Sequence, residues 1–418
     1  NIGESRSNSL LINWKRFVTY QTIDFYKNEI ESLKRIAPNI PVTTNFHGDL
    51  SDLDYFKFKD FIDFASWDAY PMWGMPEGDL SEAIKYSFVF DLCRSIKQKP
   101  FLLMESTPSN LCVHNYNKPK RPGVNKASSL LAVAHGSNSV QYFQWRKSRG
   151  SCEQFHGAVV DNSGSEDTRV FREAADIGET LKKISAVCNS GINAKAAVIF
   201  DWENRWALDF AAGFQKEDKK YVEECIKNYK FFWKCGINTD VIDSEQDFSK
   251  YQIIVAPMLF MIKPNVVKRL KDFVEKGGIL ISGFISGYVN EDGLSFTKGI
   301  CESGFYELFG IENEETDVLY PNEKNAVIFG EKQYAAYDYC EIIHPTDAEV
   351  LATYAGDYYA GYPAVTKNAV GKGAAYYVAF RGDDDFLDAF YSSLPVACEA
   401  ICGEISYPDG VGVNSRND

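Results

Sequence analysis

The sequence predicts an α/β protein in two parts, half of a (β/α)8 barrel followed by an open, doubly wound α/β domain. Three observations support this. Short apolar runs alternate with helical patterns, which implies βαβ units and parallel sheets. The first four runs end in polar or aromatic residues, as strands do at the mouth of a barrel. After a small-residue linker near 187–193 ("VCNSGIN"), the pattern becomes that of a doubly wound sheet.

The first part opens with apolar residues at helical spacing over residues 8–36, which stop before Pro38. Four predicted strands follow, with helices between or after them. The strands are expected at 40–46, 61–71, 99–106 and 138–146, and the helices at 79–98, 125–135 and around 168–186.

The second part consists of buried-looking strands separated by two clear helical patterns. Its strands are expected at 194–201, 238–243, 251–258, 277–283 and 374–380, and its helices near 217–234 and 263–276.

Length and charge exclude several classes of function. The 418 residues predict two or three domains, and the net charge of −14 with no basic run argues against a nucleic-acid partner. No apolar stretch approaches the roughly 20 residues of a membrane span. We therefore expect neither a nucleic acid nor a membrane as a partner.

Ten cysteines are scattered along the chain without a CxxC pair or a zinc-ligand spacing. This distribution fits reduced thiols in the cytoplasm and predicts no metal site. The chain begins at Asn1 with neither Met nor a signal-like segment, and we expect this start to be a cut end.

Glu105 ends the apolar run "KPFLLMES", and two interpretations of it are open. A retaining glycosidase needs two carboxyls about 5 Å apart, and a glutamate at a strand end suits the nucleophile. Tyr70 would then hydrogen-bond the carboxylate and keep it ionised, and Trp145 would form an apolar floor for a sugar ring. In the other interpretation Glu105 is a surface residue where a strand ends, the commoner case for a carboxylate outside a motif.

Arg146, Glu153 and His156 lie in one loop, residues 143–161, after the fourth predicted strand. Charged groups in such loops commonly bind sugar hydroxyls, although a solvated loop with an incidental ion pair is the alternative. Among the other histidines, His135 and His344 are expected to be structural. The roles of His47 and His114 are left open.

Several segments of the chain resemble glycoside hydrolase family 42 β-galactosidases. They are "VTTNF", "SWDAYP", "LLMESTPSN", "KPKRPG", "AHGSNSVQYFQWRKSRGSCEQFHGAVVD", "TRVFRE", "FDWENRWAL" and "YYAGYPAVTKNAVGKGAAYYVAF". The resemblance covers nearly the whole chain. It implies the second half of a TIM-barrel catalytic domain at 1–187 and a flavodoxin-like or amidotransferase-like trimerisation domain at 193–403. Residues 404–418 would begin a small C-terminal β-domain.

Carried over residue by residue, the resemblance implies that Glu105 is the catalytic nucleophile. It implies that Glu153 and His156 bind the galactose hydroxyls, and that Tyr70 is the strand-tip tyrosine beside the nucleophile. With Trp145 and Arg146, these residues make up the expected site.

The chain departs from the family pattern in two places. The family often has Asn-Trp shortly after the nucleophile, where this sequence has Cys112 and Val113. The family's acid/base glutamate follows an asparagine in an earlier strand, ahead of this sequence, whereas Glu4 has no asparagine before it. A structural zinc, found in some members, would also lie in that earlier half. We therefore expect a fragment lacking the first half of the barrel and the C-terminal β-domain.

The implied function is retaining hydrolysis of terminal β-D-galactosides by a homotrimer that needs no organic cofactor. One alternative is the same machinery acting on α-L-arabinopyranosides, β-fucosides or β-glucosides. Another is a non-catalytic assembly or sugar-binding protein, if the chain is complete as written. In the second domain an amidotransferase would need a nucleophilic cysteine, but the expected turn holds Ser282 and Ser286, so assembly is the better interpretation.

Overall fold

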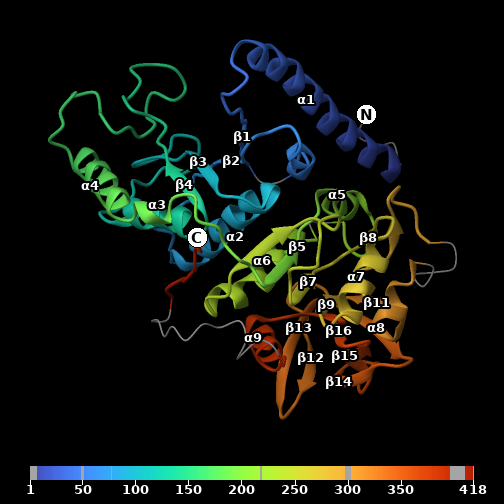
Figure 1. Cartoon of the computed structure of the whole chain (residues 1–418). Helices are drawn as coiled ribbons and strands as arrows, with labels where there is room; N and C mark the ends of the chain where they lie inside the picture. Colours follow the sequence, from blue (N-terminus) through green and yellow to red (C-terminus); the bar gives the residue numbers. More distant parts are fainter. Residues whose placement is uncertain are drawn as a thin grey trace. The chain divides into compact units, whose positions relative to one another are not determined.

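A computed structural model of the chain separates into two compact units (Figure 1). The sheet unit comprises Asn1–Gln21, Ser51–Asp54 and Ala194–Ser406, and the barrel unit comprises Thr22–Leu50, Tyr55–Asn193 and Tyr407–Asp418. The structure describes residues 7–48, 51–76, 78–216, 219–296, 303–395 and 410–417. No helix in these ranges is long and apolar enough to cross a membrane.

The barrel unit is built on four parallel strands in the order β1-β2-β3-β4. They span Asn45–Phe46, Ser66–Asp68, Phe101–Glu105 and Ser137–Val140. The four strands predicted from sequence are therefore present, although β1 and β2 are shorter than expected. Parallel strands of one sheet end at the same edge, so the polar residues that follow them are gathered there.

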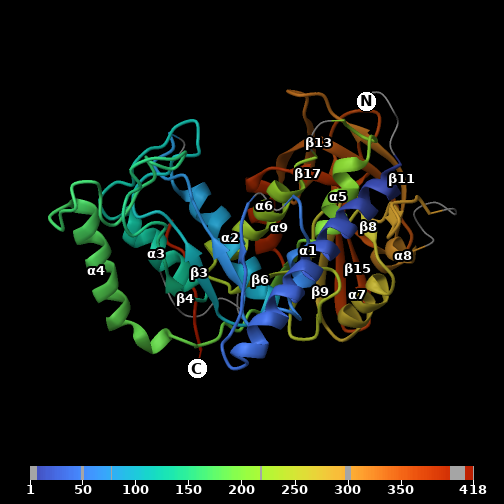
Figure 2. The same ribbon diagram turned by 90° about the horizontal axis from the view of Figure 1, so that it is seen from above.

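Helices pack against the sheet of the barrel unit, while the first helix of the chain belongs to the sheet unit as far as Gln21. The helix predicted at 8–36 is α1 (Asn8–Ile36), and α2 (Leu80–Lys97), α3 (Val124–Ala134) and α4 (Arg169–Lys183) follow the predicted pattern. α2 packs on β2, α3 packs on β4, and α4 lies against α3. Figure 2 shows α3 between β4 and α4. Short 3-10 turns lie at Tyr55–Phe58 and Ser185–Val187.

His135 has the structural role that the sequence predicted. Its Nδ1 lies 2.9 Å from Asp91 Oδ1, and the same carboxylate pairs with Arg94. Arg94 also donates to the His135 carbonyl, at 2.9 Å. These three side chains are all buried, so the charges of α2 are neutralised inside the unit.

The sheet unit contains five parallel strands in the order β6-β5-β7-β9-β16, as the doubly wound pattern predicted. Alternate side chains of a strand face opposite sides of the sheet. One face packs against α7 and α8 through a buried apolar cluster, and α6 and α9 pack against each other, with α6 on β5. The strands are Thr239–Ile242, Ala196–Ile199, Ile253–Ala256, Ile279–Gly283 and Gly373–Val378, and the helices α6 to α9 are Tyr221–Lys234, Val266–Glu275, Phe305–Phe309 and Asp384–Ser392.

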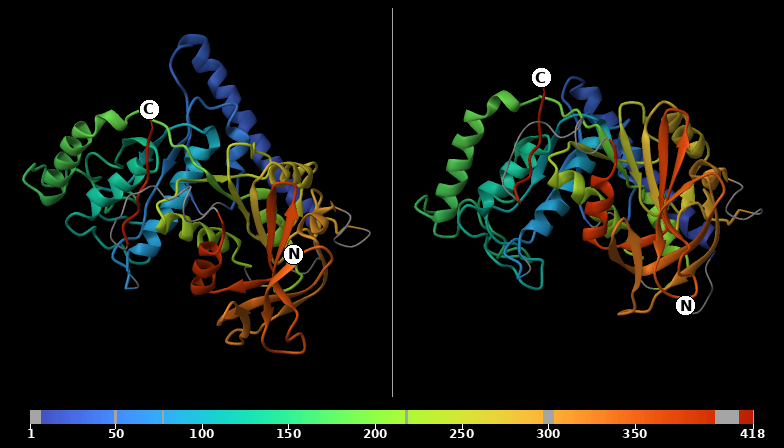
Figure 3. Two further views of the ribbon diagram at one scale, coloured as in Figure 1. Left: turned by 60° about the horizontal axis from the view of Figure 1, so that its bottom comes forward. Right: turned by 90° about the horizontal axis from the view of Figure 1, so that it is seen from below.

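An antiparallel extension continues this sheet, and the sequence interpretation did not foresee it. Its strands, orange to red in Figure 3, carry many polar residues such as "IENEETDV" and so lack a continuous apolar run. They are β11 (Ile311–Val318), β12 (Asn325–Phe329), β13 (Lys332–Pro345), β14 (Glu349–Tyr354), β15 (Pro363–Val370) and β17 (Phe380–Gly382). The remaining elements are α5 (Trp202–Phe210), β8 (Met261–Ile262) and β10 (Val289–Asn290).

Part of the lead-in predicted at 404–418 falls on residues 404–409, outside the described ranges. In the part that the structure describes, Asn417 pairs with Gly191 through two backbone hydrogen bonds of 2.7 and 2.8 Å. Arg416 donates to the carbonyl oxygens of Val133, Ser137 and Ser190.

Candidate active site

Glu105 is the last residue of β3 and is half-buried at the carboxyl edge of the barrel-unit sheet. The hydroxyl of Tyr70, which follows β2, donates to Glu105 Oε2 at 2.6 Å. This is the hydrogen bond expected from the sequence. Burial and the bond to Glu105 raise the pKa of Tyr70, so the phenol stays protonated and remains the donor.

Asp68 at the end of β2 and Asn45 of β1 extend this group across the sheet. Asn45 Nδ2 donates to Asp68 Oδ2. Asp68 is 8% exposed, and its pKa is raised to about 6. Burial is the main cause and the charge of Glu105 adds to it, whereas Asn45 and His47 act in the opposite direction.

Backbone hydrogen bonds join the loop after β3 to the loop after β4. Phe143 N donates to the Ser106 carbonyl at 2.9 Å, and Gly157 N donates to the Asn110 carbonyl at 2.8 Å. A Cβ on Gly157 would lie 2.8 Å from the Asn110 oxygen, so only glycine fits this approach. The contact brings residue 156 beside the end of β3.

His156 is buried between aromatic rings at this junction. Its ring centroid lies 5.8 Å from that of Tyr70 and 4.9 Å from that of Phe143. Burial lowers the pKa of His156, although Glu153 and Glu105 oppose this effect, so the imidazole is neutral at neutral pH. Cys112 and Val113 stand where the family often has Asn-Trp. Cys112 Sγ lies 3.8 Å from His156 Nδ1, so the cysteine is in contact with the imidazole. Val113 at the second position is 69% exposed.

The other predicted residues divide into two groups. Glu153 is partly buried, and its charge acts on both Tyr70 and His156, which places it with them. Arg146 and Trp145 are exposed, and the Trp145 ring contacts Phe171, with 6.4 Å between centroids. The structure thus brings together Glu105, Tyr70, Glu153 and His156, with Arg146 and Trp145 on the outside of the loop.

Lys120 is a buried lysine that the sequence interpretation did not single out. It is 4% exposed and donates to the Thr107 carbonyl at 2.6 Å and to Asn125 Oδ1 at 3.0 Å. Burial lowers its pKa to about 7, against a small opposing effect of Glu173. Because Thr107 follows Glu105 by two residues, Lys120 fixes the chain just beyond the carboxylate. The motif "KPKRPG" was the available signal.

The two histidines with open roles lie near this edge. The charge of His47 acts on Asp68, and its carbonyl accepts from Tyr55 at 2.8 Å. His114 Nε2 is enclosed and has no hydrogen-bond partner in the described structure. His344 lies far along the chain on β13, beside Glu314, and fits a structural role.

Several polar atoms around the strand ends are enclosed without a hydrogen-bond partner in the described part of the chain. Buried polar groups normally have partners, and each exception needs an explanation. These atoms lie at the end of β2 and in the loops that follow β2, β3 and β4. The atoms are Asp68 Oδ1, Trp73 Nε1, His114 Nε2, Gln144 Nε2 and His156 Nε2.

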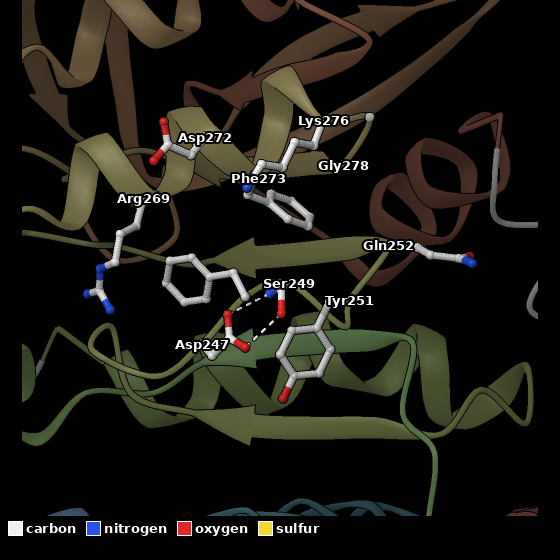
Figure 4. A pocket seen from close by; sticks show the side chains of 11 residues that line it. Asp247, Ser249, Tyr251, Gln252, Arg269, Asp272, Phe273, Lys276 and Gly278 are labelled. Atoms are coloured by element: carbon white, nitrogen blue, oxygen red, sulfur yellow. Dashed lines mark hydrogen bonds between the residues drawn. The ribbon is translucent and has the colours of Figure 1, made fainter.

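A separate pocket of about 420 Å³ lies in the sheet unit, between α7 and the segment before β7 (Figure 4). Phe248 and Phe273 form part of its wall, with Arg269 and Lys276 at the helix side. None of the predicted site residues lines it, and within the described ranges none of its lining atoms is a buried polar atom without a partner. We therefore assign the candidate site by its chemistry to the barrel unit.

In the described residues, no group of three or more His, Cys, Asp or Glu side chains has a metal-binding arrangement. Ser282 Oγ donates to the Ala256 carbonyl at 2.8 Å and Ser286 Oγ accepts from Leu259 N at 2.9 Å. Both hydroxyls are buried in structural bonds, in agreement with the assembly interpretation.

Comparison with known proteins gives two family models that follow each other along the chain. Residues 1–184 match a model described as β-galactosidase, and residues 194–399 match one described as β-galactosidase trimerisation domain.

Named relatives match over the whole chain. β-Galactosidase Pbg of Clostridium perfringens is 48% identical over 430 residues, covering 100% of this chain and 62% of the relative. β-Galactosidase GanA of Bacillus subtilis is 46% identical over 425 residues, covering 100% of this chain and 63% of the relative. The chain therefore spans about three fifths of the length of these relatives.

Solved structures give the same result. The structure of Gan42B, a GH42 β-galactosidase, has a TM-score of 0.96 and 44% identity, covering 100% of this chain and 62% of that one. A catalytic mutant of Gan42B from G. stearothermophilus matches equally well, with a TM-score of 0.96. The cold-adapted β-galactosidase from Rahnella sp. R3 has a TM-score of 0.95 and 43% identity, with 100% and 62% coverage. The described fold is thus a partial TIM barrel followed by a trimerisation domain.

Proposed function

The chain belongs to the glycoside hydrolase family 42 β-galactosidases, and on this premise we propose that it carries the nucleophile of a retaining β-galactosidase. The observation that supports this most is the 2.6 Å hydrogen bond from Tyr70 to Glu105 at the carboxyl edge of the sheet. A carboxylate at this edge, with a donor fixed on one oxygen, leaves its other oxygen available for attack.

In the proposed reaction, Glu105 attacks the anomeric carbon of a terminal β-D-galactoside. A C1–O ester bond forms as the glycosidic C1–O bond breaks, and a glutamate outside this sequence protonates the leaving oxygen. The same glutamate then removes a proton from water, which attacks C1 and releases galactose with its β configuration retained. The residues of this chain supply the nucleophile and hold the sugar, and no organic cofactor is needed.

We assign sugar binding to the loop after β4. Glu153 is partly exposed and ionisable, and it therefore suits two hydroxyls of one sugar. His156 is neutral and rigidly packed, and its enclosed Nε2 has no protein partner in the described structure, so sugar binding would require a small opening of the loop. Trp145 and Arg146 are exposed on the same loop and remain predicted contacts of the substrate.

The choice of galactose is also part of the proposal. A galactoside differs from a glucoside at the 4-hydroxyl, and a site that hydrogen-bonds a hydroxyl rejects analogues in which that bond is lost. Rates on aryl β-galactoside, β-glucoside, β-fucoside and α-L-arabinopyranoside test this assignment. A β-glucoside preferred over the β-galactoside would refute it.

We propose that the chain acts as a homotrimer, with the catalytic part at 1–187, the trimerisation part at 193–403 and the lead-in at 404–418. Light scattering after size-exclusion chromatography should give three times 47.1 kDa, about 141 kDa. A cytoplasmic location is also proposed, because all cysteines of the described ranges are free thiols.

Covalent labelling tests the nucleophile directly. A 2,4-dinitrophenyl 2-deoxy-2-fluoro-β-galactoside carries a leaving group that departs without acid assistance, so the test needs only the residues of this chain. Peptide mass analysis should place one fluorogalactosyl group on the peptide that contains Glu105, and Glu105→Gln should abolish the label.

Glu166→Gln, which changes an exposed glutamate of the same unit, is the matched control and should label like the unaltered chain. Labelling at another residue would show that the nucleophile is wrongly assigned. If a chain of intact mass 47.1 kDa takes up no label, it does not form a working nucleophile site by itself.

A further inference from the structure

A second carboxyl lies beside Glu105, and the proposed mechanism does not use it. Asp68 ends β2, and its Cα is the register partner of the Glu105 Cα on β3. The register shifts by one residue just before this pair, so Glu105 rather than Met104 lies opposite Asp68. A bulge of this kind redirects a side chain, and here it directs the Glu105 carboxyl to the same side of the sheet as Asp68.

The surroundings of Asp68 disfavour a second negative charge. Its side chain is 92% buried, since only 8% is exposed. Asn45 donates to Oδ2, whereas Oδ1 is enclosed with no partner in the described structure. An ionised carboxylate with an unsatisfied buried oxygen is costly, and a proton on that oxygen reduces the cost.

The neighbouring groups act on Asp68 in opposite directions. His47 is the cation-forming side chain that faces Asp68, and Glu105 is the anion-forming one. Burial outweighs the favourable contributions of Asn45 and His47, and the pKa of Asp68 is raised. The titratable groups that face the carboxyl pair are His47, Tyr70, Glu153 and His156.

We propose that Asp68 is a positioning residue that, in mildly acidic solution, holds a proton beside the ionised Glu105, so that the two neighbouring carboxyls together carry one negative charge. This role of Asp68 rests on the proposed function, in which Glu105 is the nucleophile. Asp68 itself does not touch the reacting carbon.

A consequence for the reaction follows from linkage. The negative charge of Glu105 favours the protonated form of Asp68, and ester formation removes that charge. By reciprocity, the ionised form of Asp68 must favour ester formation at Glu105 to the same extent. Each pKa unit of coupling corresponds to a tenfold change in that equilibrium. We therefore expect the rate of labelling to rise roughly three- to tenfold as the pH passes through about 6.

The titration itself can be measured without any activity. In the whole chain labelled with ¹³C at the aspartate carboxyl, one resonance should titrate near pH 6 and disappear in Asp68→Asn. In Glu105→Gln the midpoint of that resonance should move down toward the ordinary aspartate value of 3.8. A midpoint at the ordinary value in the unaltered chain, or one that stays fixed in Glu105→Gln, would overturn the proposal.

Labelling kinetics give the second readout. The rise near pH 6 should be absent in Asp68→Asn and present in Asp176→Asn, which alters an exposed carboxyl on α4. A purely structural role would lower the rate of Asp68→Asn equally at every pH and keep the rise, which would refute the inference.

The two proposals can fail separately. If Glu105 takes the label but Asp68 does not respond to Glu105→Gln, the charge sharing is wrong and the proposed function stands. If Asp68 titrates as expected but the label falls on a residue other than Glu105, the charge sharing stands and the assigned nucleophile is wrong.

Discussion

Replacing Tyr70 by phenylalanine is the sharpest test of how the site holds its nucleophile. The change removes the hydroxyl that donates to Glu105 Oε2 at 2.6 Å and leaves the ring that packs against His156. A hydrogen bond to a charged group contributes about 1.5–3 kcal/mol, which corresponds to a factor of roughly 10 to 150 in rate. Glu105 is half-buried, so water replaces part of the lost bond. We therefore expect labelling to slow by roughly 10- to 30-fold.

The assay is the release of dinitrophenolate from the fluorogalactoside, followed with time and confirmed by intact mass. The unaltered chain, Tyr70→Phe and Tyr20→Phe are compared at one pH. Tyr20 is 60% exposed on α1, so its substitution controls for the loss of a hydroxyl as such. In Tyr70→Phe the label should remain on Glu105, because the attacking carboxylate is unchanged.

A labelling rate within twofold of the unaltered chain would show that the hydroxyl neither orients nor stabilises Glu105. An equal loss in Tyr20→Phe would show that the effect is not specific to the site. A slower rate accompanied by a large fall in melting temperature would assign Tyr70 to folding and would likewise refute the reasoning.

Three further predictions concern the supporting structure. Gly157→Ala places a Cβ 2.8 Å from the Asn110 oxygen and should lower the labelling rate at least tenfold by separating the two loops, as labelling kinetics can show. Lys120 has a folded pKa of about 7 against an ordinary 10.5, so between these pH values the unfolded chain binds more protons and stability rises with pH. Urea unfolding should show this rise of roughly 2–4 kcal/mol between pH 7 and 9.5, and Lys120→Met should abolish it. Lys263→Met leaves the buried Asp201 without the ammonium 2.8 Å away and should cost about 3–5 kcal/mol, seen as a lower melting temperature of the sheet unit. A rate, a pH dependence or a melting temperature equal to that of the unaltered chain would contradict the corresponding prediction.

The fold was largely predictable because its elements obey simple periodicities. The helix expected at 8–36 is α1, and the parallel strands of both units were found from apolar runs. The antiparallel strands from 311 to 370 were not, because polar side chains interrupt their apolar pattern. An antiparallel strand with one face exposed to solvent needs apolar residues only on its buried face. Its sequence therefore shows no continuous apolar run from which it could be predicted.

The sequence was sufficient to predict several residues of the candidate site, but not most of the contacts that these residues make. Tyr70 and Glu105 could be paired, because they end neighbouring strands. The role of Asp68 depends on a one-residue register shift at Met104, and such a shift leaves no mark in the apolar pattern. The exposure of Trp145 depends on the course of a loop, which is set by backbone hydrogen bonds and not by residue type.

The ionisable side chains of the two units differ in how fully they are paired or hydrogen-bonded. In the sheet unit the buried Arg381 pairs with Glu224 at 3.1 Å, and the buried Glu341 accepts from Tyr377 at 2.6 Å. Buried ionisable groups that are paired or hydrogen-bonded in this way are fixed parts of the packing, and releasing them for a reaction would cost stability. Glu105 instead sits half-buried at a sheet edge with one oxygen held by a phenol, which leaves hydrogen-bonding capacity for a substrate. Substitutions at Arg381 or Glu341 should therefore change melting temperature and assembly, whereas those at Glu105 should change labelling and leave melting temperature and assembly unaltered.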